Sequence, residues 1–143
     1  MVRRWGSSIV LAAAGLFLGG VLLAQGRVVS AVVVFVLFVA FAAVTSPPGF
    51  PRSVSDAEAR AASARDGHAI VYWRPGCPYC ARLRVSLGRR ASRLHWVDIW
   101  ADPAGAATVR DITGGDETVP TVVTPSESFV NPSPLLVRQL ALH

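Results

Sequence analysis

Two long apolar runs without a charged residue fill the first third of the chain, and they constrain its fold more than any other feature. The first covers residues 5–25 and the second residues 28–46, with only Gly26 and Arg27 between them. Each run approaches the roughly 20 residues that a helix needs to cross the 30 Å apolar core of a bilayer. The sequence therefore predicts a membrane anchor over residues 1–46, built as a hairpin of two transmembrane helices.

Two other interpretations of these runs stay open. A buried helix pair in a soluble protein would need a large surrounding fold, and only about a hundred residues follow the hairpin. A cleaved signal peptide would suit the charged start at Arg3 and Arg4, but the residues near Ala24 match a cleavage site poorly and a second apolar run follows at once. Gly15 and Gly19 are spaced as in a helix-packing face, and we expect them to pack the hairpin on itself.

Arginines set the expected orientation, because cytoplasmic loops carry an excess of basic residues. Arg3 and Arg4 precede the first run, only Arg27 lies in the loop, and further arginines follow the second run. Both chain ends should therefore be cytoplasmic, which makes the protein a two-span protein of the cell membrane. All 14 basic residues are arginines, but they form no dense stripe interleaved with aromatic residues, so we expect no nucleic-acid partner.

The remaining residues alternate between helical and extended patterns. Residues 47–67 read as a proline-rich linker and a short helix, which Ser55 and Glu58 open with a capping box. Strand patterns occupy 68–73, 94–100, 121–124 and 128–131, and helical patterns occupy 78–90, 103–112 and 134–142. Alternation of strand and helix favours parallel pairing, and the short turn between the last two strands requires antiparallel pairing. The fold class is therefore α/β, with a mixed four-stranded sheet flanked by helices over residues 68–143.

The two cysteines, Cys77 and Cys80, lie where a strand passes into a helix. Pro78 suits the first helical position, which places Cys77 at the helix N-terminus, where free N–H groups and the helix dipole stabilise a thiolate. Cys80 lies one turn further on, within reach of a disulfide. We therefore expect Cys77 to be an exposed nucleophile and Cys80 to be a deeper resolving thiol with a higher pKa.

Other uses of the cysteine pair stay open. Closing so short a loop adds little stability, which argues against a structural staple. Structural zinc needs four ligands, and the three histidines show no ligand spacing, so we expect no metal site. An iron–sulfur cluster shared by two subunits would need one thiolate from each subunit and external thiols.

Three arginines lie near the cysteine pair in the sequence, and each of them has more than one interpretation. Arg74, three residues before Cys77, could stabilise the thiolate or hold an anionic substrate, or be an ordinary loop arginine. We expect Arg82 and Arg84 to form a solvated helix face.

Thr118, Val119 and Pro120 precede a strand. A cis proline can occur at such a position, but the spacing alone does not decide whether the bond before Pro120 is cis or trans.

Together these motifs resemble the glutaredoxins of the thioredoxin superfamily: Cys77-Pro-Tyr-Cys80 after a strand, with Thr118-Val-Pro120 about forty residues later. The resemblance implies a thioredoxin-like fold, a cis bond before Pro120 and a redox pair of Cys77 and Cys80. It also implies that Arg74, Tyr79, Thr118, Val119 and Pro120 bind the substrate thiol, with the backbone of Val119 pairing with it.

One departure separates this chain from typical glutaredoxins. Those proteins grip the carboxylate of glutathione with a Gly-Gly-x-Asp motif after the cis-proline strand, where this chain has Asn131-Pro-Ser133. This arrangement is similar to the mycoredoxin branch, and it favours mycothiol over glutathione as the small-thiol co-substrate, with no bound cofactor. The Pro78-Tyr79 dipeptide is typical of glutaredoxins, so glutathione stays open as the alternative.

The resemblance implies an enzyme, a membrane-anchored thiol–disulfide oxidoreductase that reduces mixed disulfides or protein disulfides at the cytoplasmic surface. Its partners would be a small thiol, disulfide-containing proteins and membrane lipid. The alternative is a non-enzymatic docking or iron–sulfur-carrying module for a membrane partner. Neither the protein substrate nor the oligomeric state follows from the sequence.

Overall fold

The computed structural model describes residues 2–45 and 49–141 of the 143 residues, without the side chains of residues 2–8 and 45. The last residue of the expected anchor, residue 46, and the start of the expected linker, residues 47–48, lie outside the described residues. The chain divides into two compact units, Met1–Gly49 and Phe50–His143. Each unit is described separately.

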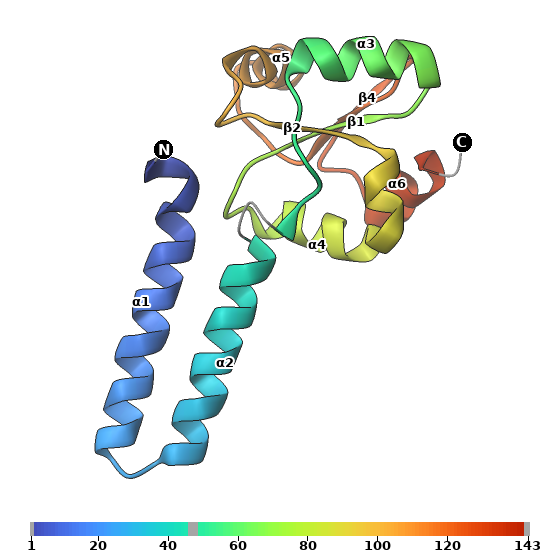
Figure 1. Cartoon of the computed structure of the whole chain (residues 1–143). Coiled ribbons are helices and arrows are strands. Elements are labelled where there is room, and N and C mark those ends of the chain that lie inside the picture. The colour runs from blue at the N-terminus through green and yellow to red at the C-terminus, as the bar shows by residue number, and fades with distance from the viewer. Residues whose placement is uncertain (1, 46–48, 142–143) are drawn as a thin grey trace. The chain divides into compact units, whose positions relative to one another are not determined.

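The first unit is a pair of helices, α1 (Val2–Ala24) and α2 (Val28–Thr45), which form where the sequence predicts helices (Figure 1). Gly26 turns the chain between them with a φ of 73°, a value that glycine adopts without steric cost. Gly15 allows close packing, because a Cβ atom there would meet Cβ of Phe38 at 2.7 Å. Gly19 has more room, since its nearest neighbour is the Ala31 carbonyl oxygen at 3.8 Å.

Within residues 2–45 and 49–141, no helix combines the length and the apolarity that crossing a membrane requires.

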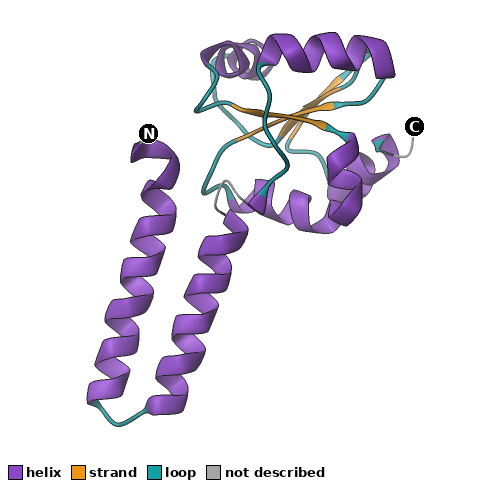
Figure 2. Ribbon diagram, viewed as in Figure 1, coloured by secondary structure: helices purple, strands orange, loops and turns teal. Residues whose placement is uncertain are grey.

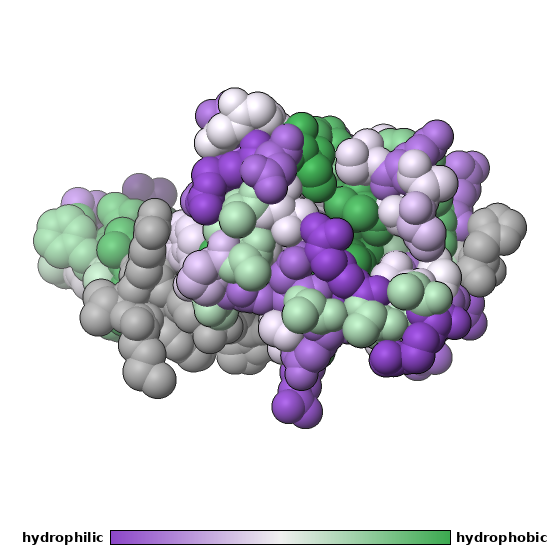
Figure 3. All heavy atoms as spheres, turned by 90° about the horizontal axis from the view of Figure 1, so that it is seen from above, coloured by the Kyte–Doolittle hydropathy of each residue, from purple (hydrophilic) through white to green (hydrophobic). Residues whose placement is uncertain are grey.

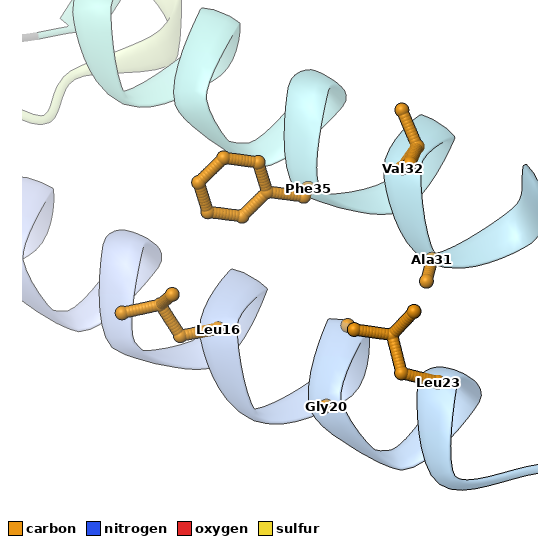
Figure 4. Close-up of a pocket in the computed structure, with 7 residues that line it drawn as sticks. Leu16, Gly20, Leu23, Ala31, Val32 and Phe35 are labelled. Carbon is orange, nitrogen blue, oxygen red and sulfur yellow. The ribbon is translucent and has the colours of Figure 1, made fainter. Parts of the chain in front are cut away.

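An apolar groove of about 280 Å³ lies between α1 and α2 (Figure 4). Its lining is made by Leu16, Gly19, Gly20, Leu23, Ala31, Val32 and Phe35. None of these side chains can act as an acid, a base, a nucleophile or a metal ligand. The groove is therefore a packing feature of the hairpin and carries no chemistry of its own.

The second unit alternates helices and strands in the predicted order. Its elements are α3 (Asp56–Asp66), β1 (Ile70–Trp73), α4 (Pro78–Leu87), the 3₁₀ helix η2 (Gly88–Arg93), β2 (His95–Asp98), α5 (Pro103–Thr113), β3 (Thr121–Val123), β4 (Ser128–Val130) and α6 (Pro134–Leu140). The predicted capping box forms at the start of α3: the Ser55 hydroxyl accepts from the Glu58 N–H, and the Glu58 carboxylate accepts from the Ser55 N–H at 2.9 Å.

The four strands form one mixed sheet in the order β2-β1-β3-β4. β1 pairs parallel with β2, and β3 pairs antiparallel with β4, as the element pattern predicts. β1 pairs antiparallel with β3, which the alternation of strands and helices did not predict. Helices α3 and α5 lie on one side of the sheet and α4 and α6 on the other (Figure 2). This mixed sheet with flanking helices is consistent with the expected thioredoxin-like fold.

The core of this unit is centred on β1, whose four residues are all buried. Trp73 and Trp96 are both fully buried, and each indole N–H has a partner: Trp73 donates to the Ser53 hydroxyl and Trp96 to the Ala91 carbonyl. Burying side chains of this size contributes about 2–3 kcal/mol each. Hydrophilic side chains cover much of the surface seen from above, with apolar residues visible between them (Figure 3).

The segment before α3 also contributes to this core. Phe50 is buried and stacks on Trp73, with ring centroids 3.9 Å apart, and meets Trp96 edge-on at 5.7 Å. Ser53 forms a parallel bridge with Trp96 beside β2, and the Val54 N–H donates to the Trp96 carbonyl at 2.9 Å. Residues 50–54 therefore add a short extended segment at the β2 edge of the sheet.

Several element boundaries differ from the sequence analysis by one to three residues. The helix predicted to reach residue 90 ends at Leu87, because Gly88 takes a φ of 55° and the chain continues as η2. The strand predicted to start at residue 68 starts at Ile70, and the strand predicted to reach residue 100 ends at Asp98. The turn after Asp98 follows from its own hydrogen bonds, since its carbonyl accepts from Ala101 and Asp102.

Candidate functional site

The two cysteines lie at the junction between β1 and α4. Cys77 is the N-cap residue of α4, with an extended backbone, and Pro78 occupies the first helical position. The Cys77 sulfur accepts a hydrogen bond from the Cys80 N–H at 3.2 Å, which uses one of the free amides at the start of the helix. Gly76, with a φ of 77°, turns the chain from the strand into the cap. Both cysteines are free thiols.

The peptide bond before Pro120 is cis, as the resemblance implies, and the loop that contains it lies against Cys77. The Cys77 thiol donates to the Val119 carbonyl oxygen at 3.5 Å. This contact brings together two motifs that are 42 residues apart in the chain. Val119 and Pro120 are both buried, so the loop forms a fixed wall beside the sulfur.

Cys77 is less accessible than the sequence analysis expected. Its exposed fraction is 7%, so the expectation of an exposed nucleophile was wrong, because the Val119 side of the cis-proline loop covers it. Cys80 is fully buried at 0%, which fits the expected deeper position. Cys77 therefore offers only a small part of its surface to a substrate disulfide, and Cys80 offers none.

The two thiols have opposite pKa shifts. The pKa of Cys77 falls from 9.0 to about 7, chiefly through a hydrogen bond with the Cys80 side chain, against the opposing effect of burial. The Cys80 N–H and the charge of Arg74 lower it further. The pKa of Cys80 rises, because burial and the neighbouring Cys77 both disfavour a second thiolate. At neutral pH the thiolate therefore belongs to Cys77.

Arg74 is half-buried, with its guanidinium carbon 5.8 Å from the centre of the Trp100 ring. A guanidinium at this distance from an aromatic face is held by a cation–π attraction. Its charge lowers the pKa of Cys77 and so stabilises the Cys77 thiolate, which is one of the roles that the sequence analysis gave for Arg74. Among the uses left open for Arg74, this arrangement favours support of the thiolate.

A groove of about 210 Å³ lies beside the cis-proline loop. Its lining comes from the start of α4, from Pro120 and from the segment between β4 and α6: Tyr79, Arg82, Leu83, Pro120, Asn131, Pro132, Ser133 and Pro134. Asn131 takes a φ of 47°, and its N–H donates to the Pro120 carbonyl at 2.8 Å. This hydrogen bond holds the segment between β4 and α6 against the cis-proline loop. The groove can receive the portion of a thiol that lies beyond its sulfur.

The candidate thiol-binding residues are not all in this groove. Tyr79 is 58% exposed and lines it together with Pro120. Thr118 is exposed and does not line it, and its carbonyl accepts from the Thr121 hydroxyl. Arg82, expected only on a solvated helix face, is exposed and also lines the groove. Arg84 is half-buried, against expectation, and donates to the Gly88 carbonyl at the end of α4.

Fold and site define a thioredoxin-like domain with a two-cysteine centre at a helix N-terminus, opposite a cis proline. Comparison with protein families finds a match to the Glutaredoxin family over residues 69–129. This match supports a relation of residues 69–129 to the glutaredoxins and the thioredoxin superfamily, and with it a thiol–disulfide oxidoreductase chemistry. No curated protein and no solved structure gives a significant match to the chain.

The pKa of Cys77 predicts how fast its thiol is alkylated at different pH values. Only the thiolate reacts, so the alkylation rate should reach half its maximum near pH 7 and fall about tenfold for each pH unit below that. Arg74→Gln should move this midpoint to higher pH because a stabilising charge is lost. Arg89→Gln, an exposed arginine beyond the other end of α4, is the control. An unchanged midpoint in Arg74→Gln would contradict the role of its charge.

Proposed function

We propose that this protein reduces mixed disulfides and protein disulfides, with Cys77 as the nucleophile and Cys80 as the resolving thiol. The observation that carries the proposal is the placement of the Cys77 sulfur. It accepts from the Cys80 N–H at the start of α4 and lies 3.5 Å from the Val119 carbonyl of the cis-proline loop. Its pKa near 7 makes a large fraction reactive at neutral pH, while a thiolate of that pKa is still a good nucleophile.

The proposed reaction proceeds by two exchanges. The Cys77 thiolate attacks one sulfur of the substrate disulfide, forms a mixed disulfide and releases the other sulfur as a thiolate. Cys80 then gives up its proton and attacks the Cys77 sulfur, which releases the second substrate thiol and leaves a Cys77–Cys80 disulfide. Alternatively, an external small thiol attacks the mixed disulfide and frees Cys77. In either case two electrons reach the substrate, and small thiols supply them.

For the small thiol, we propose mycothiol in preference to glutathione. The groove beside Pro120 is lined by the Asn131 amide and the Ser133 hydroxyl, neutral groups that suit the hydroxyls of a sugar-bearing thiol. The Gly-Gly-x-Asp sequence that would hold a glutathione carboxylate is absent from residues 129–133. Arg82 contributes the one formal charge among the lining residues.

A comparison of three substrates tests this function. The full chain in detergent should reduce a mycothiol-capped peptide with a kcat/KM about tenfold or more above that for the glutathione-capped peptide, a difference of about 1.4 kcal/mol in transition-state binding. A peptide with an internal disulfide is the third substrate. Equal or better use of glutathione would overturn the choice of thiol, and failure on all three would overturn the oxidoreductase function.

We further propose that the helical hairpin anchors this domain to the cell membrane, with the domain on the cytoplasmic side. The support is the absence of any charge from residues 5–25 and 28–46 together with the exposure of large apolar side chains on both helices. Phe17 of α1 is 72% exposed and Val29 of α2 is 78% exposed. Apolar surface of this extent in water is unfavourable, and lipid tails would cover it.

Cysteine labelling in intact cells tests the orientation. Because the loop is expected on the outer side, a membrane-impermeant thiol reagent should label a Gly26→Cys variant. It should leave Cys77 and Cys80 unlabelled even after reduction. Permeabilised cells are the control, since there the native pair should react. Labelling of the reduced native pair in intact cells would reverse the proposed orientation, and loss of the protein into the soluble fraction would overturn the anchor.

A further inference from the structure

Two histidines that are far apart in the sequence meet one aspartate at the end of the sheet away from the cysteines. Asp66 is the last residue of α3, His68 immediately precedes the segment that enters β1, and His95 is the first residue of β2. The Asp66 carboxylate lies 3.0 Å from Nε2 of His95 and 3.5 Å from Nδ1 of His68. Cys77 follows the opposite end of β1, so this cluster takes no part in the redox site.

The backbone holds the three side chains in place. β1 and β2 pair in parallel with Ile70 opposite His95, and the His95 N–H donates to the Ala69 carbonyl at 3.1 Å. Gly67, in the left-handed conformation, ends α3 and directs the chain into the strand. The His68 N–H donates to Oδ1 of Asp66 at 2.9 Å, which orients the carboxylate. The cluster is thus fixed by one helix end and two strand starts.

The spacing of the ligand atoms suits one small cation. One donor atom from each of the three residues lies within 4.8 Å of the others. A tetrahedral ion with bonds of about 2.0–2.2 Å would hold its ligands about 3.3–3.6 Å apart. The two separations from Asp66, 3.0 and 3.5 Å, are close to that range. The three side chains are 20–38% exposed, so an ion and a completing water molecule can reach them.

The donor set indicates which ions fit. Two imidazole nitrogens and one carboxylate oxygen suit zinc and its neighbours copper and nickel, whereas magnesium and calcium prefer oxygen ligands only. Oδ1 of Asp66 remains paired with the His68 N–H, an outer contact of the kind that orients metal-binding carboxylates.

We propose that Asp66, His68 and His95 form a binding site for a divalent transition-metal ion of the zinc type, with water as the fourth ligand. The ion joins the end of α3 to the starts of β1 and β2 and so stabilises the domain against unfolding. The site lies apart from Cys77 and Cys80, so the proposal does not depend on the proposed redox function. Sequence spacing gives no indication of it, because 26 residues separate the two histidines.

Zinc binding to the full chain in detergent tests this site. The chain is purified without a histidine tag and carries Cys77→Ser and Cys80→Ser, because thiolates bind zinc themselves. Calorimetry should show one equivalent of zinc bound. Co²⁺ added in place of zinc should give the visible absorption of a tetrahedral ion. In this background His68→Gln and His95→Gln should each weaken zinc binding about a hundredfold or more, because loss of an outer-shell partner alone costs about 10–100-fold.

His143→Gln is the matched control, because His143 is the remaining histidine of the chain and follows His95 by 48 residues in the sequence. It should leave zinc affinity unchanged. Added zinc should raise the melting temperature of the cysteine-free chain and of His143→Gln, but not that of His68→Gln or His95→Gln. Circular dichroism without metal establishes that each variant is folded. Absence of zinc binding in the cysteine-free chain, unchanged affinity in both cluster variants, or loss of affinity in His143→Gln would overturn the site.

Discussion

Cys77→Ser should lose essentially all activity on a thiol-capped peptide, by about a thousandfold or more, whereas Cys80→Ser should keep a substantial part of it. Cys77 is the residue at the N-terminus of α4, where the Cys80 side chain, the Cys80 N–H and the Arg74 charge favour its thiolate. Serine at that position has no accessible anion at neutral pH. Cys80 has a raised pKa and is fully buried, so it cannot take over the attack.

The two variants separate the roles because one thiolate suffices for a small-thiol substrate. In Cys80→Ser, free thiol attacks the mixed disulfide on Cys77 and regenerates the enzyme. Reduction of a peptide with an internal disulfide needs both cysteines, because Cys80 must release the second sulfur of the peptide from Cys77. On this substrate both variants should therefore fail. The assay measures initial rates on the two substrates at one thiol concentration. Retained activity of Cys77→Ser on either substrate would overturn its role as nucleophile.

Local signals in the sequence predicted most of the second unit. Ser55 and Glu58 form the capping box that their spacing indicates, and Pro78 begins α4. The order of strands and helices predicted the parallel pairing of β1 with β2, because the helix α4 between them brings the chain back to start β2 in the same direction. It did not predict that β3, which follows α5, pairs antiparallel with β1. The cis bond before Pro120 came from the family resemblance, since spacing alone does not distinguish cis from trans.

Long-range packing accounts for what the sequence did not predict. The low exposure of Cys77 depends on Val119, 42 residues away, whose carbonyl lies over the sulfur. The pairing of His68 with His95 through Asp66 depends on the register of β1 with β2, which no short motif encodes. The end of α4 depends on Gly88 adopting a positive φ, although glycine inside a helical pattern is also tolerated.

The segment before α3 illustrates the same limit. Its prolines suggest an extended linker, and residues 50–54 are indeed largely extended. An extended segment can, however, pack its side chains against a sheet. Phe50 does so, because β1 and β2 present Trp73 and Trp96 to it at 3.9 and 5.7 Å. A single phenylalanine among prolines carries no periodicity, so its burial is visible only in the fold.

Phe50→Ala should destabilise the second unit by about 3 kcal/mol or more, the cost of emptying a buried aromatic site. Phe50 is 7% exposed and its ring lies nearly parallel to that of Trp73, with an angle of 14° between the planes. Removing it takes apolar surface away from two tryptophans at once and leaves a cavity beside β1. For a unit of about ninety residues, the melting temperature should fall by more than about 10 °C.

Leu135→Ala is the matched control, because Leu135 lies on α6 in the same unit but is 72% exposed, and its loss should change stability by no more than about 0.5 kcal/mol. Urea unfolding followed by tryptophan fluorescence measures both variants, since Trp73 and Trp96 report directly on the packing around Phe50. A Phe50→Ala variant no less stable than Leu135→Ala would contradict the stacking. The folded unit would then begin after Phe50, and residues 50–54 would be a linker in function as well as in sequence pattern.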